Sequence, residues 1–375
     1  MRKNYLWIAA LATTMMTSCI YDNENDLLTA QQGQYSNEEI LITAAMQEPA
    51  GETRAASTLQ GASITWTNAG IYVYKTTQTS VSGNYGFENQ QVTGSSSYSS
   101  GGVTGDKLTI GSSLLFPYDN GDVDVYVYAP HTNVTTGLTT TTGVTATSVS
   151  NMAIQVQDDQ TETNDYIKSD FIYGMAKAYY DNSPTDYVDK VAQVTMYHAL
   201  TKLTFKLQDG SNTTPSLGTD ASGITEIKLT NVYKKATIDM TEPVTATSAP
   251  WLTAGTHVTT ADGTGDPKGD VIVAQFTGTT GDHTTNFYST AKTDGVSAII
   301  PPCTSTQLTA ADPGISVTID GGTKTAKIKG TDITELVPGY EYVFNLKISG
   351  TELIIVAVSI KPWETQTAVD RTLDF

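Results

Sequence analysis

Apolar residues recur at every second position along most of this 375-residue chain, in short runs separated by Gly, Asn, Asp, Ser and Pro. In one such run Val123, Val125 and Val127 alternate with Tyr126 and Tyr128 on the opposite face. A period of two is typical of β-strands, because successive side chains of a strand point to opposite sides of the sheet. Many short strands of this kind, with almost no helical periodicity, predict an all-β fold built from β-sandwiches.

Two hairpins are predicted in the C-terminal part of the chain. In the first, residues 315–328, the alternation breaks at Asp320-Gly321-Gly322, where glycine accepts the positive φ that a tight turn needs. In the second, residues 340–360, Ser349-Gly350 separates two alternating apolar runs. Each pattern predicts two antiparallel strands joined by a short turn.

The regular pattern changes at several places in the middle of the chain. Around Leu200–Lys202 the apolar residues move from even to odd positions, which predicts a β-bulge, and nearby His198 is expected to be a packed or hydrogen-bonded core residue. Segment 78–107, rich in Ser and Gly, and segment 131–151, rich in Thr, are predicted to be long surface loops. Residues 182–192 contain a pattern-breaking Asn-Ser-Pro and mark the predicted domain boundary.

The N-terminus has the features of an export signal. Two basic residues precede a mostly apolar run, residues 5–16, that is too short to span a bilayer. The sequence Met16-Thr17-Ser18-Cys19 resembles the lipobox of bacterial lipoproteins, in which the cysteine is acylated and becomes the N-terminus. We therefore predict a lipoprotein signal peptide over residues 1–18 and a lipid on Cys19. The alternative is an ordinary secretory signal with a chance cysteine.

Composition and motifs argue against several classes of function. The formal net charge of −18 opposes binding to nucleic acid or anionic lipid through the overall field. The four histidines are scattered, and the chain contains no HExxH, GxSxG or Walker-type motif. Carboxylates are so abundant that two of them meeting as a glycosidase pair would carry no information. We therefore predict that the protein is not an enzyme and holds no cofactor.

One acidic segment has a spacing that invites a calcium site. Asp262, Asp266 and Asp270 supply oxygen ligands within a short loop. However, Pro267 and Val273 occupy the positions where an EF-hand loop has glycine and glutamate. We therefore predict no metal site.

Some residues allow both a structural and a functional interpretation. Cys303 follows an apolar strand and is expected to be a small buried hydrophobe rather than a nucleophile. If Cys19 carries lipid, Cys303 has no partner for an internal disulfide. Three tryptophans could stack on sugars, although burial in a sandwich is the commoner fate: Trp66, Trp251 and Trp363.

Several segments together resemble the fimbrillin family of Bacteroidetes, whose members build type V pili. They are the lipobox with the early Arg54, the run HALTKLTFKL at 198–207, the run ITEIKLTNV at 224–232, and LVPGY at 336–340 followed by KPW at 361–363. The resemblance spans essentially the whole chain. It implies two transthyretin-like β-sandwich domains in tandem, export as an outer-membrane lipoprotein, cleavage after an arginine by an extracellular trypsin-like protease, and polymerisation by strand exchange.

These expectations divide the chain into four parts. The signal peptide is residues 1–18, and the propeptide with lipidated Cys19 and a removable strand is residues 19–54. The N-terminal β-sandwich domain is predicted over residues 55–188 and the C-terminal one over residues 189–375.

The residues themselves support a removable N-terminal strand. In the run 39–46 four apolar residues share even positions: Ile40, Ile42, Ala44 and Met46. A stretch of small residues follows and contains Arg54, the only Lys or Arg between Lys3 and Lys75, so a tryptic protease would cut there and leave Ala55 at the new N-terminus. Release of the strand would leave unpaired backbone groups on a sheet, which can pair with a strand of another chain.

The C-terminal segment 365–375 is the predicted donor strand. Val369, Leu373 and Phe375 share one parity, with Arg371 between them. Burial of each apolar side chain stabilises a joint by roughly 1.5–3 kcal/mol. The alternatives are that this segment is the last strand of its own domain or a frayed tail.

The leading hypothesis is a structural subunit of a cell-surface fimbrium that contributes to adhesion. Its expected partners are other fimbrial subunits, an arginine-specific extracellular protease, and receptors on host or bacterial surfaces; no nucleic acid is expected. The alternative is a surface adhesin or glycan-binding lipoprotein that does not polymerise, including a fimbrial tip subunit. The sequence leaves the stalk, tip and anchor roles open.

Overall fold

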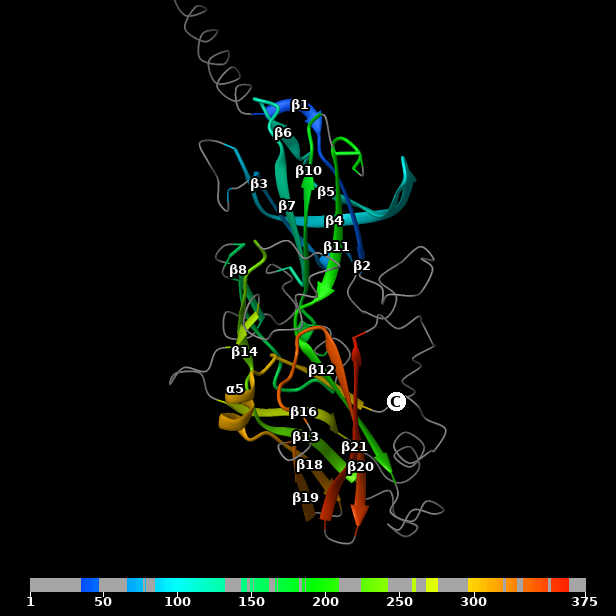
Figure 1. Cartoon of the computed structure of the whole chain (residues 1–375), viewed down its shortest axis with the longest axis vertical. Helices are drawn as coiled ribbons and strands as arrows, with labels where there is room; N and C mark the ends of the chain where they lie inside the picture. Colours follow the sequence, from blue (N-terminus) through cyan, green and yellow to red (C-terminus); the bar gives the residue numbers. More distant parts are fainter. Residues whose placement is uncertain are drawn as a thin grey trace, which may run out of the picture.

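The structure, a computed structural model, describes the following residues: 35–46, 66–76, 78, 85–131, 143–146, 149–150, 152–161, 166, 168–181, 184–185, 187–208, 224–241, 258–260, 268–275, 296–319, 322–328, 333–349 and 352–363. These residues are mainly β-strand, together with the short helices η1 (Trp66–Asn68) and α5 (Ser305–Ala311). The predicted all-β fold is therefore confirmed. A barrel forms the upper half of the molecule in Figure 1 and two packed sheets form the lower half.

The upper half is a closed barrel in which every strand pairs on both sides. Its strands follow one another around the barrel in the order β10 (Ile172–Ala178), β11 (Val191–His198), β2 (Leu41–Met46), β5 (Val103–Ile110), β4 (Phe87–Ser100), β3 (Gly70–Lys75) and β7 (Val123–Ala129). A separate two-stranded sheet, β1 (Tyr35–Glu39) with β6 (Leu115–Pro117), lies next to the barrel. Closure matters because a barrel presents no unpaired strand edge to solvent.

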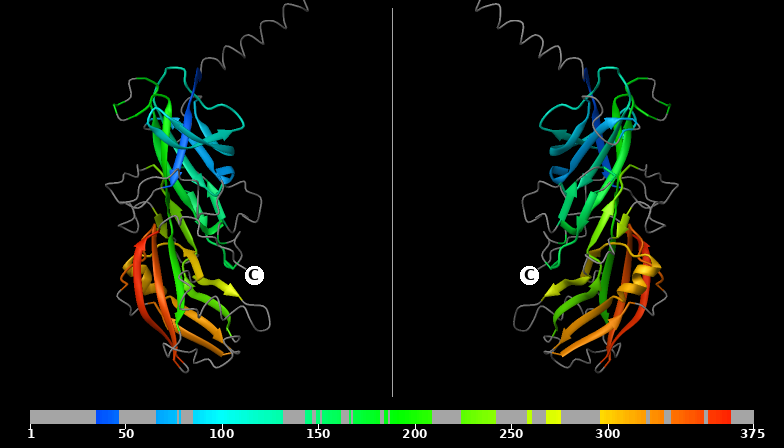
Figure 2. Two further views of the ribbon diagram at one scale, coloured as in Figure 1. Left: turned by 90° about the vertical axis from the view of Figure 1, so that its right-hand side faces the viewer. Right: turned by 90° about the vertical axis from the view of Figure 1, so that its left-hand side faces the viewer.

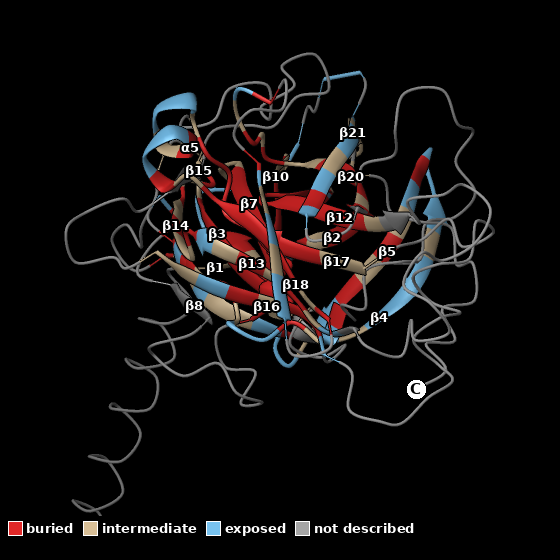
Figure 3. Ribbon diagram, turned by 90° about the horizontal axis from the view of Figure 1, so that it is seen from below, coloured by how far each residue is buried: buried red, intermediate tan, exposed pale blue. Residues whose placement is uncertain are grey.

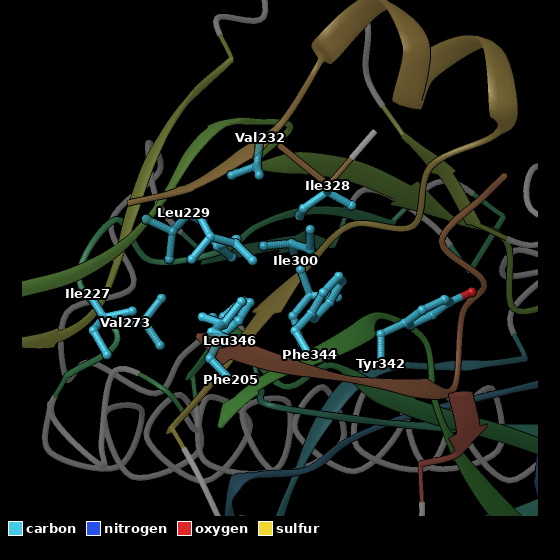
Figure 4. Packing of buried hydrophobic residues seen from close by; sticks show 14 of the residues in the cluster. Phe205, Ile227, Leu229, Val232, Val273, Ile300, Ile328, Tyr342, Phe344 and Leu346 are labelled. Carbon is cyan, nitrogen blue, oxygen red and sulfur yellow. The ribbon is translucent and has the colours of Figure 1, made fainter. Parts of the chain in front are cut away.

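The lower half consists of two four-stranded sheets that enclose one core. One sheet has the order β17 (Val296–Ile300), β12 (Thr201–Gln208), β20 (Tyr340–Ser349), β21 (Glu352–Pro362); the other has the order β16 (Gly269–Gln275), β13 (Ile224–Val232), β18 (Gly314–Ile319), β19 (Gly322–Lys327). Phe205, Phe344 and Leu346 point from one sheet toward Ile227 and Leu229 of the other (Figure 4). The outer residues of β21 are exposed, whereas those of β12 and β20 are largely buried (Figure 3).

A third four-stranded sheet joins the two halves. Its order is β15 (Val258–Thr260), β14 (Lys235–Ile238), β9 (Met152–Gln155), β8 (Gly143–Ala146), so strands far apart in the sequence pair directly. The tyrosines of β3, β7 and β10 are buried here with Met152, Ile238 and Ile299. Those of β7, Tyr126 and Tyr128, were expected on the second face of their strand. Both faces of these barrel strands are therefore covered, one by the barrel core and one by this junction.

The two predicted hairpins are confirmed. Strands β18 and β19 pair from Gly314↔Lys327 to Ile319↔Gly322. Strands β20 and β21 pair from Tyr340↔Pro362 to Ser349↔Glu352. The alternating apolar residues of β18 and β20 face the lower core, as their period of two requires. On β21 Leu353 also faces this core, whereas Ile354, Val356 and Ile360 are exposed.

The segment predicted as a surface loop over residues 78–107 instead contains a long hairpin of β4 and β5. It pairs from Val92↔Ile110 to Ser100↔Val103 and turns at Gly101-Gly102, whose φ angles are 59° and 85°. The prediction was wrong because serine-rich strands lack apolar alternation and are held here by backbone pairing. Part of the second predicted loop, 131–151, is also strand, since β8 lies within it.

The bulge predicted at Leu200–Lys202 is instead a break between two strands. β11 ends at His198 in the barrel and β12 begins at Thr201 in the lower sandwich, so the parity change marks a change of sheet. The chain therefore passes from the barrel to the lower sheets after His198, and not at the predicted domain limit between residues 188 and 189. β11 lies beyond that limit and still pairs with β10 and β2, because Val194 and Met196 fill the barrel core.

Candidate functional site

Strand β2 occupies a position that completes the barrel. It runs parallel to β11 over six consecutive pairs, from Leu41↔Val191 to Met46↔Met196, and antiparallel to β5 at Thr43↔Lys107 and Ala44↔Asp106. Figure 2 shows this blue N-terminal segment lying along the green strands of the barrel. Without β2 the barrel would open between β11 and β5, and both of these strands would have a free edge.

The side chains of β2 are placed as its sequence pattern predicts. The even-numbered residues of β2, Ile42, Ala44 and Met46, are buried in the barrel core together with Ile40 just before the strand, and all four are at most 5% exposed. Leu41, on the other face, is only partly buried. The four apolar residues expected to belong to a removable strand therefore pack inside one hydrophobic core, that of the barrel.

The chain just before β2 is held at a second place, which sequence reasoning did not anticipate. Strand β1 pairs with β6, and the Tyr35 ring lies 5.4 Å from the ring of Tyr85 and 5.3 Å from that of Phe87. The Glu38 carboxylate is 3.1 Å from Lys190 Nζ, and this bond raises the pKa of Lys190. The N-terminal segment that binds the barrel is thus residues 35–46 rather than 39–46.

A buried acid faces β2 from the neighbouring strand. Asp106 of β5 is 9% exposed and lies directly across from Ala44. Its carboxylate accepts a 2.7 Å hydrogen bond from the indole N–H of Trp66, which is itself buried. Gly105 permits the close approach of β5, since a Cβ there would lie 3.0 Å from the Ala44 carbonyl oxygen. For Trp66, the structural interpretation is confirmed.

The prediction for His198 is confirmed as well. Its Nδ1 lies 2.8 Å from Asp170 Oδ1, and its ring stacks on Trp363 at 3.8 Å between centroids. The backbone N–H of Trp363 donates a hydrogen bond to the Gly339 carbonyl oxygen at 2.8 Å. Trp363 therefore packs on the junction and fixes the place where the chain continues toward its C-terminus.

A buried ion pair lies beside this tryptophan. Lys202 Nζ is 3.4 Å from Glu341 Oε1, and both side chains are less than a tenth exposed. Burial alone raises the pKa of Glu341, but the charge of Lys202, the Thr204 hydroxyl 2.6 Å away and the charge of Lys361 outweigh it and lower the pKa overall. This arrangement stabilises a fixed geometry and shows no feature of a reactive centre.

Cys303 is 3% exposed, and burial raises the pKa of its thiol to about 12, so the buried-hydrophobe interpretation holds. Among the described residues no group of three His, Cys, Asp or Glu could hold a metal ion. No helix in the described part of the chain is long and apolar enough to cross a membrane.

Several predicted site residues lie outside the described residues. They are the lipidation site Cys19, the processing site Arg54 and Ala55, the donor residues Val369, Leu373 and Phe375, and also Trp251 and the aspartates 262 and 266. Their roles remain predictions.

Comparison with known proteins identifies the family. The sequence profile of fimbrillin-like proteins matches residues 53–363. This chain belongs to the fimbrillin-like family. The fimbrillin resemblance of its motifs is thereby confirmed.

Solved structures share the fold of this fimbrillin-like protein. A candidate cell adhesion protein from Bacteroides uniformis is 18% identical, with a TM-score of 0.51, over 88% of this chain and 100% of its own. Another, from Bacteroides ovatus, is 15% identical, with a TM-score of 0.50, over 88% of this chain and 98% of its own. A search of curated sequences finds no match. At these identities the likeness concerns the fold alone.

Proposed function

We propose that this fimbrillin-like protein is a structural subunit of a cell-surface fimbrium and contributes to adhesion without being an enzyme. In this proposal it is exported as a lipoprotein through Cys19 and held at the outer membrane as a precursor. An arginine-specific protease then cuts between Arg54 and Ala55, and subunits polymerise by donor-strand exchange. Family membership supports the fimbrial role.

The observation that carries the proposal is the position of β2. This strand completes the barrel through backbone pairing with β11 and β5 and through three inward-facing residues, which pack in the core with Ile40 just before the strand. A cut at Arg54 would sever its covalent link to the rest of the barrel. The segment 35–46 would then be held only by non-covalent contacts, which another strand can replace.

The groove left by β2 would suit an incoming strand. The edges of β11 and β5, which run in opposite directions, would offer backbone donors and acceptors on both sides of the groove. Its floor would be apolar, lined by residues such as Val194 and Met196. The proposed donor is segment 365–375 of a second copy, which follows directly from the anchored Trp363.

The test is to treat the purified precursor with an arginine-specific protease. We expect loss of the residues before Ala55, identified by mass spectrometry, together with a ladder of detergent-resistant multimers that heat dissociates. Arg54→Ala should prevent both. Cut protein that has lost residues 35–46 and stays monomeric at high concentration would contradict the proposal and favour an adhesin that does not polymerise.

A further inference from the structure

The proposed donor carries a charge where an apolar strand should carry none. Within segment 365–375, Arg371 shares its parity with Val369, Leu373 and Phe375. A strand that points these three side chains into the groove must point Arg371 inward as well, because alternate residues face the same side. A buried arginine without a counter-charge is strongly destabilising, so the groove must either reject this strand or pair the charge.

The groove holds a suitable counter-charge. Asp106 is 9% exposed, and its side chain is on the inner face of β5, across from Ala44. Among the described residues its carboxylate has one hydrogen-bond partner, Trp66, and no ion-pair partner. A carboxylate has about four lone-pair sites, so it can accept further bonds from a guanidinium.

Ala44 is the smallest of the inward-facing residues of β2, and it is the one opposite Asp106. A donor residue that takes the place of Ala44 therefore lies beside the carboxylate. An arginine there can place its guanidinium on Asp106 and its methylene stem against the apolar floor.

We propose that Arg371 of one copy takes the position of Ala44 in the groove of the next copy and pairs with Asp106. The pairing rests on the proposed strand exchange and assigns its register. If the donor runs opposite to β2, the four side chains correspond as follows: Phe375 to Ile40, Leu373 to Ile42, Arg371 to Ala44 and Val369 to Met46.

The direction of the donor follows from the same alignment. With Arg371 at the Ala44 position and the donor running in the direction of β2, Thr367 would replace Ile40 and Phe375 would fall beyond Met46. Only the opposite direction places all three apolar residues at buried positions. The donor is therefore antiparallel to β11 and parallel to β5.

The pairing also bears on proteolysis. The chain contains three arginines, Arg2, Arg54 and Arg371, so the protease that cuts at Arg54 also recognises the donor segment. Pairing with Asp106 inside the groove of a neighbour would shield Arg371. Once multimers have formed, prolonged protease treatment should therefore leave residues 372–375 in place, whereas it should remove them from subunits that have not joined a multimer.

The experiment measures register by disulfide formation in multimers made from full-length chains that carry Cys19→Ser. A first variant carries Asp106→Cys and Arg371→Cys, and a second carries Ala192→Cys and Leu373→Cys, since Ala192 pairs with Ile42. The matched control carries Ala192→Cys and Val369→Cys, which would be linked only if the donor ran in the direction of β2. We expect intersubunit disulfides in the first two variants and none in the control.

The outcomes separate this pairing from the proposed function. If multimers form but the first variant gives no intersubunit disulfide, the pairing is wrong. If the control variant becomes linked, the direction of the donor is wrong. Either result leaves strand exchange intact. Absence of multimers from every cut variant and from the cut wild type overturns both.

A charge-neutral variant tests the pair without cysteine. Asp106→Asn keeps an acceptor for the Trp66 N–H, so the precursor should melt near the wild-type temperature. Its cut form should extend multimers at least about tenfold more slowly, because Arg371 loses its counter-charge. Combining it with Arg371→Gln should recover part of this loss, and extension at the wild-type rate by Asp106→Asn alone would refute the pairing.

Discussion

Replacing Ile42 with alanine measures how firmly the barrel holds β2 once the chain has been cut. Ile42 is 3% exposed and lies in the barrel core, so removing three of its carbons costs about 2–5 kcal/mol. Wild-type Ile40, Ile42 and Met46 each contribute roughly 1.5–3 kcal/mol of burial. The cut segment should therefore stay bound to wild-type protein for a long time when no donor is present.

The variant should release the segment faster. A loss of about 2 kcal/mol or more corresponds to about thirtyfold in the dissociation of the segment, since 1.4 kcal/mol is a factor of ten. Leu41→Ala is the matched control, because it shortens the neighbouring side chain on the outer, partly exposed face of the same strand. It should change the rate by less than about threefold.

The assay uses precursor labelled at its N-terminus with a fluorophore. After protease treatment, the rate at which the labelled fragment separates from the barrel is followed together with the rate of multimer formation. Under the proposed exchange the two rates rise together in Ile42→Ala. Equal release rates for Ile42→Ala and Leu41→Ala would refute the argument that buried contacts of β2 hold the segment.

Three further predictions concern the rest of the molecule. Lys202→Met should lower the free energy of unfolding, measured in urea, by about 3 kcal/mol, because it leaves Glu341 buried without its main counter-charge. The control Lys361→Met removes a lysine that is 44% exposed and should lower the free energy of unfolding by less than about 1 kcal/mol. Because the pKa of Glu341 is lowered from 4.5 in the folded protein, its charge stabilises the fold above that pH; the stability advantage of wild type over Glu341→Gln should shrink as the pH falls below about 4.5. Iodoacetamide at pH 8 should label Cys303 in urea and leave it unlabelled in the folded protein, and labelling under native conditions would contradict its burial.

Much of the fold could be predicted from local pattern. Strands β7, β18 and β20 were evident because apolar residues recur at every second position along them, and the glycines after β18 and β20 mark the turns. The inward face of β2 was predicted for the same reason, residue by residue. Period-two alternation reports which face of a strand is buried, and this was enough to find the candidate strand.

The pairing of strands could not be read from local pattern. β2 pairs with β11, about 150 residues further along the chain, and alternation says nothing about the partner. The hairpin of β4 and β5 was missed because its strands are rich in serine, although Gly101-Gly102 is a turn signal that could have indicated it. The role of Asp106 depends on both pairings, so the acid facing Ala44 becomes visible only in the folded chain.

The junction between the halves was also beyond sequence reasoning. The tyrosines of β7 were assigned to a second face of the strand, and the structure shows that this face is buried against β9 and β14. His198, the last residue of β11, and Trp363, which follows β21, meet at this junction from different parts of the chain. Their stacking fixes the position of Trp363, the residue after which the proposed donor segment begins.

The most direct test of the account is the sequence of the N-terminus of subunits isolated from the assembled surface fibre. Under the proposed strand exchange these subunits begin at Ala55 and lack residues 35–46, while residues 365–375 are retained. Subunits in a fibre that still contain residues 35–46 in the barrel would contradict strand exchange at this site.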